Sequence, residues 1–331
     1  MRPCFYEMSM KDSYRIAVLD LGTNTFNLLL AKVTASAYYI YYNEKFPVKI
    51  GQDGIEQGVI ANEAQQRALK ALMHYKEVIR REGVSKVYGY ATSAFRNARN
   101  GQTFKDYLEK KTGLSIQIIP GEMEARFIYE GVKIALDIGK EPCLIMDIGG
   151  GSVEFIIGNN KKIFFLKSYE IGAQRLLDLF HKTDPIEKEA RGQMKEYLEK
   201  KLVELDDAVK KYKPRILIGS SGTFDTLSEI YCLRTGNEID LEATEFPLDI
   251  DQYFEIHEEI ISKNKYDRLK IPGMLNMRAD MIVVASCLAK HVLDRYNFAG
   301  IRVSSHSLKE GMLGDIQNEL FFSKSFIASR S

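Results

Sequence analysis

The stretch Ile16-Ala-Val-Leu-Asp20-Leu-Gly22-Thr23-Asn24-Thr25 decides the fold, because it returns in the middle of the chain as Leu144-Ile-Met-Asp147-Ile-Gly149-Gly150-Gly151-Ser152. In both stretches an apolar strand ends at an aspartate, and a turn of glycine and hydroxyl residues follows. Such a turn can point several backbone N–H groups at one anion. Two turns facing each other would hold a phosphate chain, and the candidate phosphate-binding residues are Gly22, Thr23, Asn24, Thr25, Gly149, Gly150, Gly151 and Ser152.

Length and composition limit the class of protein. The 331 residues are enough for two domains, since single hydrophobic cores stop growing near roughly 250–300 residues. A hydrophobic content of 45% and a charged content of 27% are typical of a globular protein rather than a disordered one. No apolar run reaches the ~18 residues of a membrane helix, and residues 1–10 lack the apolar core of a signal peptide. We therefore expect a cytoplasmic protein with no membrane partner.

Cysteine, histidine and lysine patterns exclude further classes. The four cysteines form no C-x-x-C pair and the five histidines no H-x-x-x-H pair, which argues against disulfides and against a zinc hydrolase. The lysine pairs alternate with acidic residues on predicted helices, which is typical of solvated helix faces. With a net charge of only +1, we expect no nucleic-acid partner.

The order of predicted elements repeats once along the chain. The first half predicts strands at 16–19, 26–33 and 37–46, a helix at 62–82 capped by Asn62, a strand at 86–90, a helix at 95–111, a strand at 115–119 and a helix at 122–138. The second half predicts strands at 143–146, 153–157 and 162–168, helices at 173–180 and 187–211, a strand at 215–218, a helix from 222, a helix at 279–297, a strand at 301–304 and a helix from 308. A repeat of about one domain length indicates a duplication, and it places the ligand between the two halves.

The duplicated turn resembles the superfold of actin, heat-shock chaperones and sugar kinases, in which each half holds part of a nucleotide's phosphates. This resemblance implies an α/β fold with two duplicated actin-like ATPase (ribonuclease H-like) domains and an interdomain cleft. We assign residues 1–121 together with 306–331 to domain I, and residues 122–305 to domain II.

Six further motifs are similar to those of the exopolyphosphatase and guanosine pentaphosphate phosphatase (Ppx/GppA) family. They stand in the family's order and spacing, and the resemblance covers about Tyr14 to Leu313. It implies the short, two-domain form and, since relatives commonly pair, a homodimer. The motifs are Ala91-Thr92-Ser93-Ala94-Phe95-Arg96, Gly121-Glu122-Met123-Glu124-Ala125-Arg126, Asp147-Ile-Gly-Gly-Gly-Ser152-Val-Glu154, Glu170-Ile-Gly172-Ala-Gln-Arg175, Gly219-Ser220-Ser221-Gly222-Thr223 and Arg278-Ala-Asp280.

The resemblance also implies roles for particular residues. Glu124 matches the family's catalytic glutamate, and we expect it to act as the general base, with a pKa raised by nearby acids. Mg²⁺ takes one or two carboxylates besides phosphate oxygens, so we expect it at Asp147 and Glu154, with Asp20 as a further candidate ligand and Glu154 also counted as catalytic. Further phosphate-binding candidates are Thr92, Ser93, Arg96, Arg126, Gly219, Ser220, Ser221, Gly222 and Thr223.

Several functions follow as alternatives. The leading one is an exopolyphosphatase in which water attacks directly, because no nucleophilic cysteine or histidine accompanies the motifs. The close alternative is hydrolysis of the 5′ γ-phosphate of guanosine pentaphosphate (pppGpp), a reaction of the stringent response. A kinase or chaperone that binds ATP is a second class. A sensor without efficient turnover is a third, since Met123 and Lys309 replace the glutamate and arginine common in the family.

Overall fold

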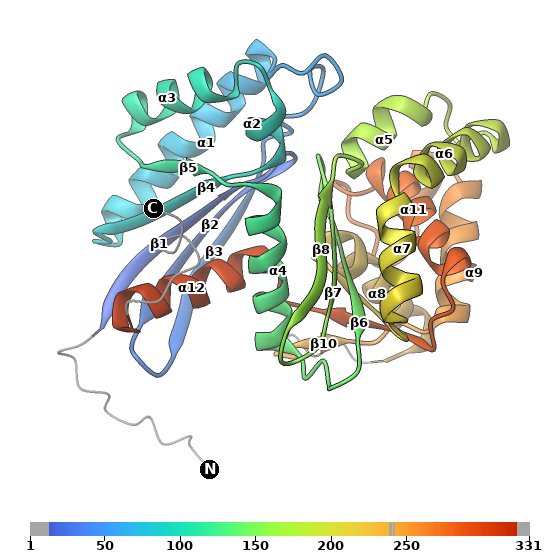
Figure 1. The fold of residues 1–331 in the computed structure, drawn as a ribbon. Helices are drawn as coiled ribbons and strands as arrows, with labels where there is room; N and C mark the ends of the chain where they lie inside the picture. Colours follow the sequence, from blue (N-terminus) through green and yellow to red (C-terminus); the bar gives the residue numbers. More distant parts are fainter. Residues whose placement is uncertain (1–12, 238–239, 241, 323–331) are drawn as a thin grey trace.

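The computed structural model describes residues 13–237, 240 and 242–322, and it consists of two α/β domains (Figure 1). The sheet of domain I contains β1 (Tyr14–Leu21), β2 (Thr25–Val33), β3 (Tyr38–Pro47), β4 (Lys86–Ala91) and β5 (Ile116–Ile118) in the order β3-β2-β1-β4-β5. Strand β1 is antiparallel to β2 and parallel to β4. The predicted antiparallel three-stranded start is therefore confirmed.

The sheet of domain II repeats this topology. It contains β6 (Cys143–Ile148), β7 (Val153–Gly158), β8 (Ile163–Tyr169), β9 (Ile216–Ser220), β10 (Glu245–Phe246) and β11 (Gly300–Ser304) in the order β10-β11-β9-β6-β7-β8. Strand β6 is antiparallel to β7 and parallel to β9, and β9 is parallel to β11. Apart from the short β10, each strand has its counterpart in domain I, which confirms the duplicated α/β fold.

The two hairpins that carry the repeated motif match residue by residue. Asp20 is paired with Asn27 across β1 and β2, and Asp147 is paired with Glu154 across β6 and β7. Each hairpin closes with the same hydrogen bond, from Gly22 N to Thr25 O and from Gly149 N to Ser152 O, both of 3.1 Å. Asn27 and Glu154 therefore occupy equivalent positions, and only the second hairpin carries two acids.

Twelve helices lie among the described residues: α1 (Asn62–Arg81), α2 (Ser93–Asn97), α3 (Gly101–Thr112), α4 (Gly121–Ala135), α5 (Ala173–Phe180), α6 (Lys188–Lys201), α7 (Val203–Tyr212), α8 (Ser221–Thr235), α9 (Ile250–Ser262), α10 (Lys265–Arg268), α11 (Met281–Arg295) and α12 (Leu308–Phe322). None of them is long and apolar enough to cross a bilayer. The described cysteines, Cys143, Cys232 and Cys287, are buried free thiols, whereas Cys4 lies outside the described residues.

Some predicted helices differ from the structure. The helix expected at 95–111 is two helices, α2 and α3, and the helix expected at 187–211 is interrupted at Leu202 between α6 and α7. Asn62 is the first residue of α1 and makes no capping hydrogen bond, since Ala61 holds the N-cap position. The predicted elements lack α9, α10 and β10, although Asp249 and Asn264 cap the two helices in the structure.

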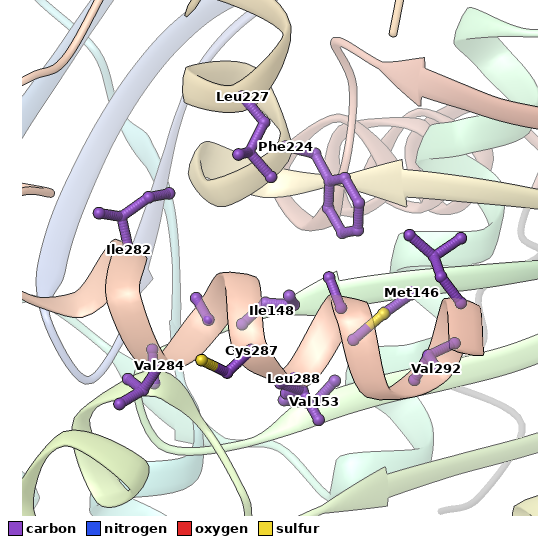
Figure 2. Close-up of a cluster of buried hydrophobic side chains, with 14 of the residues drawn as sticks. Met146, Ile148, Val153, Phe224, Leu227, Ile282, Val284, Cys287, Leu288 and Val292 are labelled. Atoms are coloured by element: carbon purple, nitrogen blue, oxygen red, sulfur yellow. The ribbon is translucent and has the colours of Figure 1, made fainter. Parts of the chain in front are cut away.

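The core of domain II packs sheet residues between helices. Strand β6 is buried along its whole length, as expected for a central strand covered on both faces. In Figure 2, Phe224 and Leu227 of α8 lie on one side of α11. Met146 and Val153 of the sheet lie near Leu288 and Val292 of the same helix. This packing fixes strand β6, which carries Asp147.

Helix α4 lies between the two domains (Figure 1) and contributes to both cores. Its residues Met123 and Phe127 pack with β1 and α12, while Ala125 and Tyr129 pack with the sheet of domain II. The predicted boundary at 121/122 assigns α4 to domain II, and both domain ranges stay predictions. Residues 1–12, 238–239, 241 and 323–331, which fall within those ranges, lie outside the described residues.

Helices α4 and α12 cross at two glycines. A Cβ atom at Gly311 would overlap the backbone oxygen of Phe127, and one at Gly131 would overlap the backbone oxygen of Ser307. The lack of side chains there lets the two helix backbones approach closely. The crossing places the start of α12 beside the helix that connects the two halves.

We expect Gly311→Ala to destabilise the protein, because backbone atoms must move apart to admit the new methyl group. Overpacking of this kind costs about 1–3 kcal/mol, which urea unfolding measures directly. Gly192→Ala is the matched control, since Gly192 lies in exposed α6 with open space around it and should gain up to about 1 kcal/mol. Equal stability of the two variants would contradict this account of the crossing.

Candidate active site

A cavity of about 150 Å³ lies where the two repeated turns meet. Its volume is roughly ten times the ~10–15 Å³ that one water needs. Its walls combine residues of both turns with acids and cations from other elements. The lining includes Asp20, Gly22, Thr23, Asn24, Thr25, Thr92, Ser93, Glu124, Asp147, Gly149, Gly150, Gly151, Ser152, Glu154, Ser221 and Gly222.

The two turns are in direct contact across the cleft. A Cβ atom at Gly150 would collide with the side chain of Asn24, and one at Gly151 would lie 2.5 Å from the hydroxyls of Thr23 and Ser93. Glycine is therefore required where domain II meets domain I. The side-chain oxygens of Thr23 and Asn24 are buried without a hydrogen-bond partner among the described residues, so each has capacity left for a ligand.

Glu124 enters this cavity from the first turn of α4. Its carboxylate accepts a hydrogen bond of 3.0 Å from Arg96 Nη1, and its side chain is 8% exposed. Burial raises the pKa of Glu124 to about 7, Arg96 opposes the rise, and the charges of Asp20 and Asp147 add to it. We expected like charge to be the cause, whereas burial contributes most.

Arg96 lies behind Glu124 and does not line the cavity. Its Nη1 also donates to the carbonyl oxygen of Ile119 at 3.0 Å, and its Nη2 lies 3.5 Å from Glu170. These contacts hold the guanidinium against Glu124 and outside the cavity lining, so phosphate binding by Arg96 stays a prediction. In this arrangement Arg96 orients the carboxylate of Glu124.

Glu170 connects Arg96 to the second turn. It accepts a hydrogen bond of 2.8 Å from Ser93 and forms an ion pair of 3.1 Å with Arg175. Arg175 Nε donates to the backbone oxygen of Gly151 at 2.9 Å. This network of hydrogen bonds and ion pairs fixes the positions of Ser93, Arg96 and the glycine turn at Gly151 relative to one another.

Asp147 and Glu154 lie together at the second hairpin. Asp147 Oδ2 accepts hydrogen bonds from Ser220 at 2.7 Å, from Ser221 at 2.6 Å and from Ser307. Glu154 is 1% exposed and accepts a bond of 2.6 Å from Ser168. Burial, followed by the charges of Glu124 and Asp147, raises the pKa of Glu154 well above its usual range.

Asp20 occupies the equivalent place in the first hairpin. Its Oδ2 accepts a bond of 2.8 Å from Asn27, whereas its Oδ1 is buried without a partner among the described residues. Burial raises the pKa of Asp20 to about 6. Two carboxyls with raised pKa values, Asp20 and Glu154, therefore share the cavity with Glu124.

The surplus of carboxylates suits a bound cation. The described residues contain no group of three or more His, Cys, Asp or Glu side chains arranged to hold a metal by themselves. Mg²⁺ needs only one or two protein carboxylates when phosphate oxygens and water complete its shell. The unpartnered Oδ1 of Asp20 and the buried acids of the second hairpin fit such a cation.

Several predicted phosphate-binding residues lie outside the cavity. Arg126 lines a different hollow with Lys133 and Lys162, because residues two apart on a helix point to different sides, and Glu124 takes the cavity side. A Cβ at Gly219 would overlap the ring of Phe224, so this glycine serves packing. Ser220 supports Asp147, and Thr223 is buried at the start of α8. Only Ser221 and Gly222 of that motif reach the cavity.

The lining also contains four charged residues that are not among the predicted site residues: Lys45, Asp225, Arg278 and Lys309. Arg278 lies against Gly222, where a Cβ would overlap its guanidinium, and the Arg278-Ala-Asp280 motif could have pointed to it. Burial lowers the pKa of Lys45 and raises that of Asp225. Lys45 comes from strand β3, whose sequence carries no signal for such a role.

Comparison with known proteins places the chain in a family. The profile described as the Ppx/GppA phosphatase family matches residues 29–319. A crystal structure described as an exopolyphosphatase from Cytophaga hutchinsonii is 40% identical, with a TM-score of 0.88 over 92% of this chain and 98% of that one. A family member from Aquifex aeolicus, 24% identical with a TM-score of 0.74 over 93% of this chain and 99% of that one, shares the fold.

Two curated relatives are longer than this chain. A guanosine-5'-triphosphate,3'-diphosphate pyrophosphatase from Pseudoalteromonas translucida is 27% identical over 92% of this chain and 59% of its own length. A bifunctional 3-dehydroquinate synthase/phosphatase from Fusobacterium nucleatum is 29% identical over 93% of this chain and 48% of its own length. The chain thus spans about half the length of these relatives. The match over most of the chain shows that this protein belongs to the Ppx/GppA phosphatase family.

Proposed function

We propose that this protein is an exopolyphosphatase that hydrolyses the terminal phosphoanhydride bond of inorganic polyphosphate. The observation that carries the proposal is the buried Glu124, whose pKa is raised to about 7 in a cavity formed by two glycine turns. A carboxylate with such a pKa is a competent base near neutral pH. The likeness to the Cytophaga hutchinsonii exopolyphosphatase structure supports this choice of substrate.

In the proposed reaction the terminal phosphate lies between the turns at Gly22 and Gly150. Backbone N–H groups and the hydroxyl of Thr23 donate hydrogen bonds to it, and Oδ1 of Asn24 accepts one from the attacking water. The deprotonated carboxylate of Glu124 accepts a proton from water, whose oxygen forms the new bond to phosphorus. The bridging P–O bond then breaks, and orthophosphate and the shortened chain leave.

Further groups position this reaction. Arg96 keeps the Glu124 carboxylate aimed into the cavity. Asp147, Glu154 and Asp20 would hold Mg²⁺, which neutralises phosphate charge when it is bound. Lys45, Arg278 and Lys309 would contact the phosphates that are not transferred. A cytoplasmic location and a homodimer stay predictions.

Hydrolysis of pppGpp is the second candidate, and the match to the Pseudoalteromonas translucida enzyme favours it. Against it, the cavity lining contains no aromatic side chain among the described residues that could stack on guanine. A linear phosphate chain needs no such contact.

Release of orthophosphate from polyphosphate, pppGpp and ATP tests the proposal. We expect the highest kcat/KM with polyphosphate. Faster release from pppGpp would favour the second candidate, and release from none of the three would favour a binding protein.

Glu124→Gln should lower kcat by about 10²–10⁴-fold, because general-base catalysis contributes about this much. The matched control is Glu122→Gln, which changes an exposed glutamate of the same turn that does not line the cavity and should keep its activity. Steady-state phosphate release measures both variants. An unchanged rate in Glu124→Gln would disprove the assigned base.

Thermal stability should depend on pH and Mg²⁺. The pKa values of Asp20 and Glu124 are raised from 3.8 to about 6 and from 4.5 to about 7, so the folded chain binds more protons than the unfolded chain between these values. Without divalent metal, the Tm should fall as the pH rises through this range. Mg²⁺ at about 100 times its Kd should add about 2.7 kcal/mol at high pH and much less at low pH. A Tm that is unaffected by Mg²⁺ at high pH would contradict the metal assignment.

A further inference from the structure

A second cavity, of about 480 Å³, lies between α6, α9 and α11 on the side of domain II away from domain I (Figure 1). None of its lining residues lines the candidate active site. Its volume falls within the roughly 300–1,000 Å³ of small-molecule sites. We call it the helical cavity, and it is lined by Lys188, Arg191, Gly192, Met194, Lys195, Leu198, Glu199, His257, Cys287, Lys290, His291, Asp294 and Arg295.

The lining of the helical cavity carries excess positive charge. It contains five lysines and arginines against two carboxylates, a net formal charge of +3. Asp294 is already paired with Lys290 at 2.6 Å, and Arg295 with Asp206 outside the lining. Glu199 is the remaining carboxylate, so the positive charge of α6 is only partly balanced.

Helix α6 turns three cations towards this cavity. Lys188, Arg191 and Lys195 follow one another at spacings of three and four, which places them on one helix face. The core-facing side of α6 carries Met194 and Leu198, and the cations lie beside it. None of the three forms an ion pair with another described residue.

Two buried nitrogen atoms of the lining, one of them in the cation Arg191, have no hydrogen-bond partner among the described residues. Nε2 of His291 and Nε of Arg191 are both buried without a hydrogen bond among the described residues, and His291 is only 8% exposed. His257, 1% exposed, is held through Nδ1 by Ser286 Oγ at 3.1 Å. Unpartnered buried polar groups are rare in native proteins, so a ligand with acceptor oxygens would satisfy this wall.

Buried neutral groups complete the cavity. Burial, followed by the charges of Lys290 and Arg191, lowers the pKa of His257 to about 4. Burial raises the pKa of the Cys287 thiol to about 12, so this thiol is neutral. The apolar part of the lining consists of Met194 and Leu198, which lie on α6 together with the cations, and of Cys287 on α11.

We propose that the helical cavity is a second binding site, which takes a small molecule carrying a phosphate monoester on an apolar or aromatic body. The phosphate dianion would lie against Lys188, Arg191 and Lys195. Three positive charges suit a doubly charged phosphate better than a ligand with one singly charged carboxylate. The body would lie against Met194 and Leu198. Binding involves no covalent step and does not depend on the function of the other cavity.

Histidine side-chain NMR on the full chain tests this proposal. Imidazole ¹⁵N and ¹H signals of His291 and His257 are followed during titration with AMP, inorganic phosphate and adenosine. Both histidines line the helical cavity and neither lines the candidate active site, so AMP that binds between the domains would not shift their signals directly. We expect saturable shifts of His291 with AMP, and affinities at least about tenfold weaker for adenosine and for phosphate, which each lack one part of the ligand.

Matched variants locate the site. Arg191→Met should weaken AMP binding about tenfold or more, whereas Lys200→Met, which changes an exposed lysine of α6 outside the lining, should leave it unchanged. Lys195→Gln changes an exposed side chain, so it keeps the test valid if Arg191→Met fails to fold, and it should also weaken binding. The proposal is overturned by no saturable shift of His291, by equal affinity for inorganic phosphate, or by equal weakening in Lys200→Met.

Discussion

The ion pair between Arg96 and Glu124 is the interaction on which the candidate active site depends. Glu124 is a buried carboxylate among other acids, and a buried charge is stable only when it is paired or protonated. Arg96 supplies the pairing at 3.0 Å, and it is fixed in turn by Ile119 and Glu170. Because Glu170 also binds Arg175, which holds the turn at Gly151, the position of the base is tied to the phosphate-binding turn.

The duplication explains both the likeness and the difference of the two domains. The hairpins have the same register and the same closing hydrogen bond, so both can present backbone N–H groups to phosphate. They differ where Asn27 of the first hairpin corresponds to Glu154 of the second. Asn27 is uncharged, so the first hairpin carries only the carboxyl of Asp20 at this position. Glu154 adds a second carboxyl beside Asp147 in the second hairpin. The sequence-based expectation that the second turn serves the metal more than the first agrees with this asymmetry, and it stays a proposal.

The sequence predicted what depends on local pattern and failed where packing decides. The repeated turns, the strand order of the first hairpin and the position of Glu124 are encoded within short stretches, and the structure brings these residues together. The directions of Arg96 and Arg126 depend on how α2 and α4 are rotated against their neighbours, which no short motif encodes. Lys45 reaches the cavity only because β3 pairs beside β2, a tertiary contact. The break between α2 and α3 was missed although Asn100 and Gly101, at the start of α3, form an Asn-Gly pair that is typical of turns.

A direct measurement of the Glu124 pKa tests the central claim. Carboxyl ¹³C chemical shifts of the glutamates are recorded against pH without substrate, and Glu124→Gln identifies the signal. The account predicts a midpoint of about 7, moving higher in Arg96→Met because the cation that opposes the rise is removed. A midpoint near 4.5, the ordinary value for glutamate, would show that Glu124 is neither buried nor suited to act as the base, and it would contradict the account.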